Sequence, residues 1–252
     1  MANDTKKIHA VQRTLEIIET ISDLEPAGVS EIARNVSVSK STVHTHLVTL
    51  AEEGYLIRDG DEYRLSCKFL SIGSSIQERF RLYRMAKQHV DELAHETGES
   101  SNLVIEEDGM GTCLYATNPK DSPDVYMSAG EKNYIHATAT GKAILAHRPK
   151  SEVETIIDRH GLPKLTEQTI TSREELFSEL EDIRDRGLSF DRQETINGLF
   201  CISAPIVVDE HAIGSISVSG PVSRFATDPR KGELCEAVEE VANVIELQFV
   251  FS

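Results

Sequence analysis

The 252-residue sequence has little positive charge, few aromatic side chains and no tryptophan. It carries 26 lysines and arginines against 42 aspartates and glutamates, a formal net charge of −16 at pH 7. Phosphate contacts supply most of the affinity for nucleic acid and need positive charge, so this imbalance at first argues against a nucleic-acid partner. Hydrophobic residues make up 39% of the chain and are spread along it, which predicts a folded protein of one large or two smaller domains.

Long apolar runs and paired cysteines are also missing. No stretch reaches the roughly 18 consecutive apolar residues that suggest a membrane-spanning helix, and the polar start of the chain does not resemble a secretory signal. The four cysteines are widely separated, which argues against a disulfide scaffold or a sequence-local zinc site. We therefore expect a cytoplasmic, reduced protein with no membrane contact, no cofactor and no metal.

The first 67 residues contain helical periodicity followed by strand periodicity. Ser30 and Ser39 are residue types that cap helix starts, and Gly54 is a typical helix stop. Asp59-Gly60 lies between two alternating runs and predicts a hairpin. The expected elements are helices over residues 8–23, 31–35 and 40–53 and a hairpin over residues 55–65. Three helices followed by a hairpin indicate a winged helix-turn-helix over residues 1–67.

The third helix and the hairpin of such a module are the parts that meet DNA. The start of the third helix enters the major groove, and the hairpin lies along the backbone. Residues 40–49 contain no acid and several hydroxyls, unusual for a solvated face in so acidic a chain. A module used only for protein contact remains the alternative. The predicted DNA contacts are Ser39, Lys40, Ser41, Thr42 and Thr45 on the helix and Arg58 and Arg64 on the wing.

Residues 68–97 form the expected linker. Their apolar positions have helical spacing, with residues 73–75 as a plausible interruption. Residues 67–90 contain five basic residues and one acidic residue, which makes this the one basic stretch of the chain. Its charges are either merely solvated or belong to a helix that forms a dimer, and we favour dimerisation because the apolar face needs a partner.

Residues 98–252 alternate between strand-like and helix-like patterns. Strands are expected near residues 103–106, 112–116, 125–127, 188–191, 200–208 and 213–219, with helices near 139–147, 151–159, 172–186 and 231–249. This order predicts an α+β domain with an antiparallel sheet and covering helices. A small molecule fits between such a sheet and its loops.

Three segments together resemble the IclR family of transcriptional regulators. They are Ser39-Lys40-Ser41-Thr42-Val43-His44, the run from His136 to Ala143, and the closing pattern from Asp191 through residues 198–205 to 215–221. The resemblance covers nearly the whole chain in the same order. It implies a winged helix-turn-helix, a linker helix and a GAF-like effector domain, assembled as a homodimer or a dimer of dimers. The implied partners are operator DNA and a small metabolite, such as an organic acid or sugar acid of carbon catabolism, which binds in the effector domain and alters operator binding.

The same resemblance implies an effector pocket. A helix N-terminus favours an anion, whereas Asp191 would repel one and is better suited to a hydroxyl. Cys201 could instead be a small buried apolar residue, and the serines could simply face solvent. The implied pocket residues are Ala139, Thr140, Gly141, Asp191, Leu199, Cys201, Ser217 and Ser219.

The sequence also departs from the family and leaves other functions to weigh. Many members carry an arginine where Thr45 stands and an apolar residue where His46 stands, which puts the strength of operator recognition in doubt. An enzyme is not expected, because the phosphate-loop and nucleophile-elbow patterns are incomplete. A redox or metal sensor on the same scaffold, using Cys113 and Cys201, is the second hypothesis.

The negative charge is distributed unevenly. Residues 1–66 hold 7 basic and 11 acidic side chains, and residues 91–252 hold 14 and 30. The acids of the first segment lie mostly outside the expected DNA-reading face. The surplus predicts a cytoplasm of very high salt, as in a halophilic archaeon, where screening leaves exposed charges little long-range effect. DNA binding should then depend less on charge than it does for a basic regulator.

Overall fold

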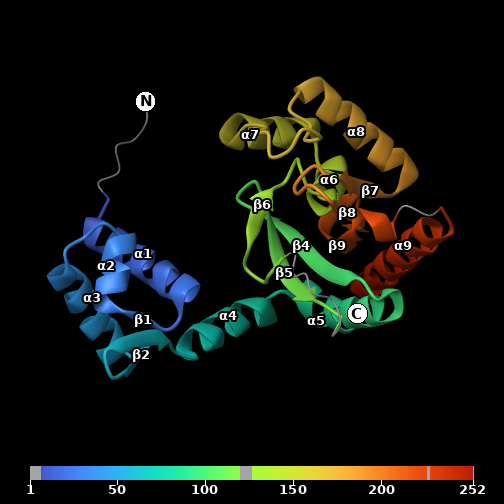
Figure 1. Ribbon diagram of the computed structural model, residues 1–252. Coiled ribbons are helices and arrows are strands. Elements are labelled where there is room, and N and C mark those ends of the chain that lie inside the picture. The colour runs from blue at the N-terminus through green and yellow to red at the C-terminus, as the bar shows by residue number, and fades with distance from the viewer. Residues whose placement is uncertain (1–6, 120–126, 226–227, 252) are drawn as a thin grey trace. The chain divides into compact units, whose positions relative to one another are not determined.

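The computed structural model describes residues 7–119, 127–225 and 228–251. The chain divides into two compact units, residues 1–79 and 80–252 (Figure 1). The unit boundary lies inside the expected linker, after α4 and before α5. Among the described residues, no helix is long and apolar enough to cross a membrane.

The first unit is a winged helix-turn-helix. Its core is formed by Ile17, Ile32, Leu47 and Tyr63, one from each of α1, α2, α3 and the wing. The wing strands β2 and β3 are antiparallel, and β1 pairs with β3 at the other edge. The elements are α1 (His9–Leu24), β1 (Ala27–Gly28), α2 (Val29–Asn35), α3 (Lys40–Glu52), β2 (Leu56–Asp59), β3 (Glu62–Leu65) and α4 (Lys68–Arg79).

The second unit is built on a six-stranded antiparallel sheet in the order β6-β5-β4-β9-β8-β7. The strands are β4 (Ser100–Glu107), β5 (Met110–Thr117), β6 (Lys132–Tyr134), β7 (Ser189–Arg192), β8 (Leu199–Val208) and β9 (His211–Pro221). The helices are α5 (Arg81–Thr97), α6 (Ala139–Ala146), α7 (Lys150–His160), α8 (Arg173–Arg186) and α9 (Asp228–Phe251), with a short 3-10 turn, η1 (Val222–Arg224). The predicted α+β class with an antiparallel sheet is confirmed.

The two faces of this sheet differ in chemistry. Along β9, Ile216 and Val218 face α5 and α9 in the main apolar core. The alternate residues Ser215, Ser217 and Ser219 point to the opposite face, where Ser215 Oγ donates a hydrogen bond to the Thr140 carbonyl of α6. The helices α6, α7 and α8 form a second apolar core on that side. The fold therefore leaves a polar strip of sheet beneath the start of α6.

Local details differ from the expectations in three places. The linker helix is interrupted at Phe80, which has an extended backbone, and α4 runs unbroken through residues 73–75. α2 begins at Val29 with Gly28 at its N-cap, so Ser30 lies inside the helix and does not cap it. Of the strand expected over residues 125–127, residues 125 and 126 lie outside the described residues, and Met127 is not in a strand. The strand observed nearby is β6.

Candidate functional site

The start of α3 presents a cluster of hydroxyl groups. Ser39 is the N-cap and accepts a hydrogen bond from the Thr42 amide at 3.2 Å. Its Oγ also lies 2.9 Å from Ser41 Oγ and 2.8 Å from Thr42 Oγ1. Thr45 is exposed one turn later and donates to the Ser41 carbonyl. These hydroxyls, the helix N-terminus and exposed Lys40 give a polar surface suited to phosphate and base edges.

The two wing arginines lie in different settings. Arg58 Nε donates to the Gly60 carbonyl at 2.8 Å, and the guanidinium lies 5.8 Å from the centre of the Tyr63 ring. Asp61 Oδ1 lies 4.0 Å from Arg58 Nη2. Arg64 is exposed on β3. Arg58 is thus held against the wing turn, while Arg64 points away from the core.

Two rows of small polar residues cross the sheet below α6. Backbone pairing places Ser100 of β4, Ser219 of β9, Cys201 of β8 and Asp191 of β7 in one row. The neighbouring row contains Asn102, Ser217, Ser203 and Ser189 in the same strand order. Within these rows Ser219 Oγ donates to Cys201 Sγ at 3.2 Å. Five residues of these rows line one cavity, and they come from four different strands: Asn102, Asp191, Cys201, Ser217 and Ser219.

The cavity has a volume of about 120 Å³. This is well below the ~300 Å³ of an ordinary drug-sized pocket. Its apolar wall comes from Met127, Leu165, Ile196 and Leu199. Its polar lining consists of Asn102, Asn133, Thr138, Thr140, Asp191, Thr195, Cys201, Ser217 and Ser219, with Ala139 completing the lining.

Ser217 carries an unused polar group at this cavity. Its side chain is fully buried, and its Oγ has no hydrogen-bond partner among the described residues. A buried hydroxyl without a partner costs about 1–3 kcal/mol. A bound molecule that hydrogen-bonds to Ser217 would recover that cost, so the cavity is suited to a polar ligand.

The N-terminus of α6 forms the wall opposite the sheet. Thr138 is its N-cap and accepts from the Gly141 amide at 2.9 Å. The first amides of a helix point out of its N-terminus and carry partial positive charge. Ala139 and Thr140, the first two residues of α6, both line the cavity. Gly141 does not line the cavity; it packs directly against the Ile135 backbone.

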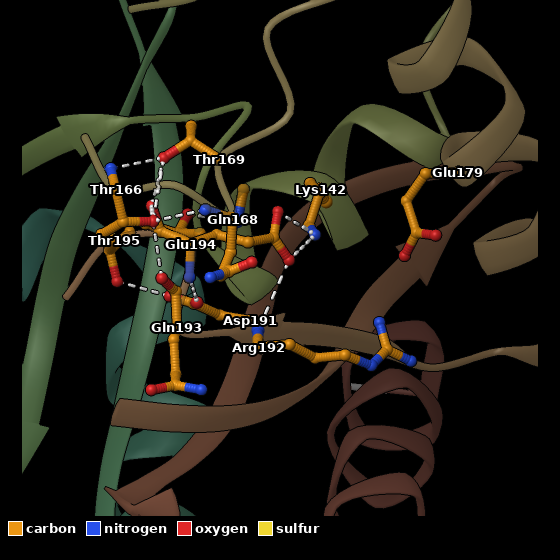
Figure 2. Close-up of polar contacts among 12 residues, drawn as sticks. Lys142, Thr166, Gln168, Thr169, Glu179, Asp191, Arg192, Gln193, Glu194 and Thr195 are labelled. Carbon is orange, nitrogen blue, oxygen red and sulfur yellow. Dashed lines mark hydrogen bonds and ion pairs between the residues drawn. The ribbon is translucent and has the colours of Figure 1, made fainter. Parts of the chain in front are cut away.

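A buried ion pair lies beside Asp191, one of the cavity-lining residues (Figure 2). Lys142 Nζ is 2.5 and 2.7 Å from the two carboxylate oxygens of Glu194. The Glu194 amide in turn donates to Asp191 Oδ1 at 2.6 Å, and Thr195 Oγ1 donates to Asp191 Oδ2. Burial raises the pKa of Asp191, opposed by these donors and by the charge of Lys142. Burial also raises the pKa of Glu194, opposed chiefly by Lys142.

The second hypothesis, a redox sensor, finds no support in the placement of Cys113 and Cys201. Burial raises the pKa of each thiol to about 12, so both are held in the unreactive protonated form. Cys113 lies on β5 and Cys201 on β8, with β4 and β9 between them. At about 4.8 Å per strand they are too far apart for a disulfide. The described residues also contain no cluster of three or more potential metal ligands.

Seven of the eight expected effector residues surround this one cavity, and Gly141 is the exception. Lys142 and Glu194 were not among the residues predicted from the sequence. A lysine inside the otherwise apolar run 139–146 was the available signal, because a buried ammonium needs a carboxylate partner. Seven further lining residues were also not predicted, because strand register and the paths of loops bring them to the cavity. They are Asn102, Met127, Asn133, Thr138, Leu165, Thr195 and Ile196.

Comparison with known proteins agrees with this architecture. Residues 10–60 match the model of the IclR helix-turn-helix domain, and residues 75–247 match that of the bacterial transcriptional regulator IclR C-terminal domain. The chain belongs to the IclR family. Its members are transcriptional regulators and not enzymes, which confirms the expectation from the sequence.

Individual relatives align over nearly the whole chain. The probable HTH-type transcriptional regulator ArcR of Halobacterium salinarum is 30% identical over 97% of this chain and 95% of its own length. BhcR of Paracoccus denitrificans is 32% identical over 98% and 89%. The crystal structure of Thermotoga maritima IclR superposes with a TM-score of 0.84, at 28% identity, covering 96% of this chain and 99% of that one. As an IclR-family regulator, the chain joins a DNA-binding module to an effector-domain fold.

Proposed function

We propose that this IclR-family regulator reads its operator with the start of α3 and supports that contact with the wing. The observation that carries the proposal is the exposed face of α3, where Lys40, Ser41 and Thr45 stand without an acidic neighbour on the helix before Glu52. Ser39 and Thr42 fix the helix start, and Arg58 and Arg64 contact backbone phosphates beside it. Titration of DNA from upstream of its own gene against a scrambled duplex tests the proposal.

Replacement of Lys40 by alanine tests the phosphate contact directly. We expect operator affinity to fall several-fold, and the slope of log affinity against log salt to decrease by about 1, because one phosphate neutralisation is lost. Fluorescence anisotropy at four KCl concentrations measures both. Lys164→Ala is the matched control, since this lysine pairs with Glu167 in the effector domain. An unchanged slope in Lys40→Ala would remove Lys40 from the interface.

We infer that the cavity binds a small hydroxylated organic acid. The carboxylate would lie at the N-terminus of α6, and a hydroxyl would donate to Asp191, with Ser217 as a further hydrogen-bonding group. The small volume favours a compound of few carbon atoms. The same fold in an IclR homologue from Microbacterium hydrocarbonoxydans was crystallised with 4-hydroxybenzoate, which also carries one carboxylate and one hydroxyl.

The regulated genes, we infer, belong to carbon catabolism. Two relatives are named for such operons: the acetate operon repressor of Salmonella typhimurium and the glycerol operon regulatory protein of Streptomyces griseus, each 28% identical to this chain. A regulator of this kind works where the chromosome is, in the cytoplasm. The charge of −16 supports a cytoplasm of very high salt, and ArcR comes from Halobacterium salinarum.

We also propose that the protein acts as a homodimer or a dimer of dimers, joined through the first unit. In α1, Val11 and Leu15 are 52% and 55% exposed on one face. In α4, Ile72 and Ile76 are exposed at helical spacing, and no residue of α4 is buried. Uncovered apolar stripes on two helices of one small unit are typical of an interface.

A double substitution, Ile72→Glu with Ile76→Glu, is expected to weaken this association. The new carboxylates would be desolvated and would repel their symmetry mates, so the dimer constant should fall by at least about tenfold. Sedimentation equilibrium measures the change. Ser71→Glu adds charge to the same helix without removing an apolar side chain and should have a much smaller effect. Equal association in the double variant and the wild type would contradict this interface.

A further inference from the structure

Lys142 places a positive charge close enough to act on Asp191, a residue that lines the effector cavity. Its side chain is fully buried on α6, three residues after Ala139, which lines the cavity. An ammonium in this position would by itself attract an anionic ligand. Both carboxylate oxygens of Glu194 contact it, however, and Glu194 is 6% exposed. Glu194 therefore neutralises the charge of Lys142.

Glu194 is fixed in this role by its backbone. Its amide donates to Asp191, and its carbonyl accepts from Thr166 Oγ1 at 3.2 Å and from Thr169 Oγ1 at 2.6 Å (Figure 2). Four segments meet at this residue: α6, the end of β7, the loop that follows β7, and the segment that holds Thr166 and Thr169. Glu194 itself is absent from the described cavity lining. Any effect that it has on a bound molecule acts through charge and position.

The charge balance of the cluster follows from these contacts. Among the described lining residues, Asp191 alone carries a formal charge. Both of its carboxylate oxygens accept hydrogen bonds, one of them from a backbone amide, and these donors favour the ionised form against the burial that raises the pKa of Asp191. With Glu194 and Lys142 also ionised, the buried cluster has a net charge of −1. Without the charge of Glu194 it would be neutral, and Lys142 would be free to balance Asp191.

We propose that Glu194 is a specificity-determining residue that limits the negative charge of the effector. This inference rests on the proposed function, in which the cavity binds a small hydroxylated acid. A single carboxylate is accommodated at the N-terminus of α6. A second carboxylate or a phosphate would lie in a cavity that is already negative, and would be rejected. Glu194 thus selects monocarboxylates without touching them.

The test compares two probes with one carbon skeleton. Glycerate and tartronate are both three-carbon 2-hydroxy acids, with one and two carboxylates. Their affinities are measured by isothermal titration on the full-length chain at constant KCl for the wild type, Glu194→Gln, Lys142→Met and the double variant. With every carboxyl group of the cluster ionised, the cluster charges in these proteins are −1, 0, −2 and −1. Buried charges are only weakly screened by salt.

The expected order of tartronate affinity is Glu194→Gln first, then the wild type and the double variant together, then Lys142→Met. Glu194→Gln should bind tartronate about tenfold more tightly than the wild type does. The increase in affinity from the wild type to Glu194→Gln should also be larger for tartronate than for glycerate. A purely structural role would give the opposite result, with the wild type binding best. If Lys142→Met fails to fold, the comparison of Glu194→Gln with the wild type and the double variant decides.

The inference is overturned if Glu194→Gln binds tartronate no better than the wild type, including the case in which neither binds it. Operator binding by the same proteins is measured separately. A lack of operator binding contradicts the proposed function but leaves the affinity order to be judged. Operator binding that responds to a metabolite, without the affinity order, contradicts the inference alone.

Discussion

Replacement of Gly141 by alanine is expected to unfold the effector domain or to destabilise it by at least about 3 kcal/mol. A Cβ at this position would lie 2.0 Å from the Ile135 carbonyl oxygen and 2.7 Å from two further Ile135 backbone atoms. The Ile135 backbone cannot move aside by a change of rotamer, as a flexible side chain could. The whole start of α6 would have to move, and with it the cavity wall and the packing of Ile144 and Leu145 in the second apolar core.

Gly73→Ala is the matched control for this substitution. Gly73 also lies within a helix, α4, but a Cβ there meets no atom within 4 Å. Alanine has the better helix propensity, so Gly73→Ala should stabilise the first unit slightly, by up to about 1 kcal/mol. Urea unfolding followed by circular dichroism measures both variants. Stability equal to wild type in Gly141→Ala would show that the close approach of α6 to Ile135 is wrong.

Replacement of Lys142 by methionine is expected to cost about 3–5 kcal/mol of effector-domain stability at neutral pH. Methionine fills similar space, but Glu194 is left as an uncompensated carboxylate beside Asp191 in the interior. The double variant Lys142→Met, Glu194→Gln should recover much of the loss, because the only carboxylate then left in the cluster is Asp191, which keeps its hydrogen bonds from the Glu194 position's amide and from Thr195. A double variant less stable than Lys142→Met would contradict this assignment of the pair.

The pH dependence of Lys142→Met has a defined sign. Burial already raises the pKa of Glu194 in the folded protein, and loss of Lys142 removes the main opposing influence. A carboxyl group whose folded pKa lies above its unfolded value destabilises the fold at pH above both values, and this penalty is lost as pH falls. The stability difference between Lys142→Met and the wild type should therefore shrink as pH is lowered from 7 into the range in which Glu194 takes up its proton. A stability difference that stays constant as pH is lowered would contradict this prediction.

Much of the fold follows from local patterns in the sequence. Caps such as Ser39 and Ser172, and the helix-ending glycines Gly54 and Gly187, have the roles that their residue types indicate. The strand runs 199–208 and 211–221 are close to their expected limits. The helix break within residues 68–97 was predicted at the wrong place. The helix continues through Gly73, and the break lies at Phe80.

The candidate site was only partly predictable, for physical reasons. The resemblance to a family led to seven cavity residues, but periodicity alone gives the spacing within a strand and not the register between strands. Asn102 lies opposite Ser217 only because β4 and β9 pair in one register out of several. The Lys142–Glu194 pair joins residues 52 positions apart through a loop. A lysine in a largely apolar helix implies that a buried ion pair exists, but the sequence does not identify the carboxylate that pairs with it.

We propose that a small acid bound in the cavity alters operator binding, and one titration tests this central claim most directly. Anisotropy of labelled DNA from upstream of the gene is measured with the wild type and with the cavity-filling variant Ser217→Leu, with and without a panel of three- and four-carbon hydroxy acids, in molar KCl. We expect sequence-preferring binding by both proteins, shifted at least several-fold by one of these acids in the wild type and unchanged by it in Ser217→Leu. Absence of preference for the upstream sequence, or an equal shift in both proteins, would contradict the account.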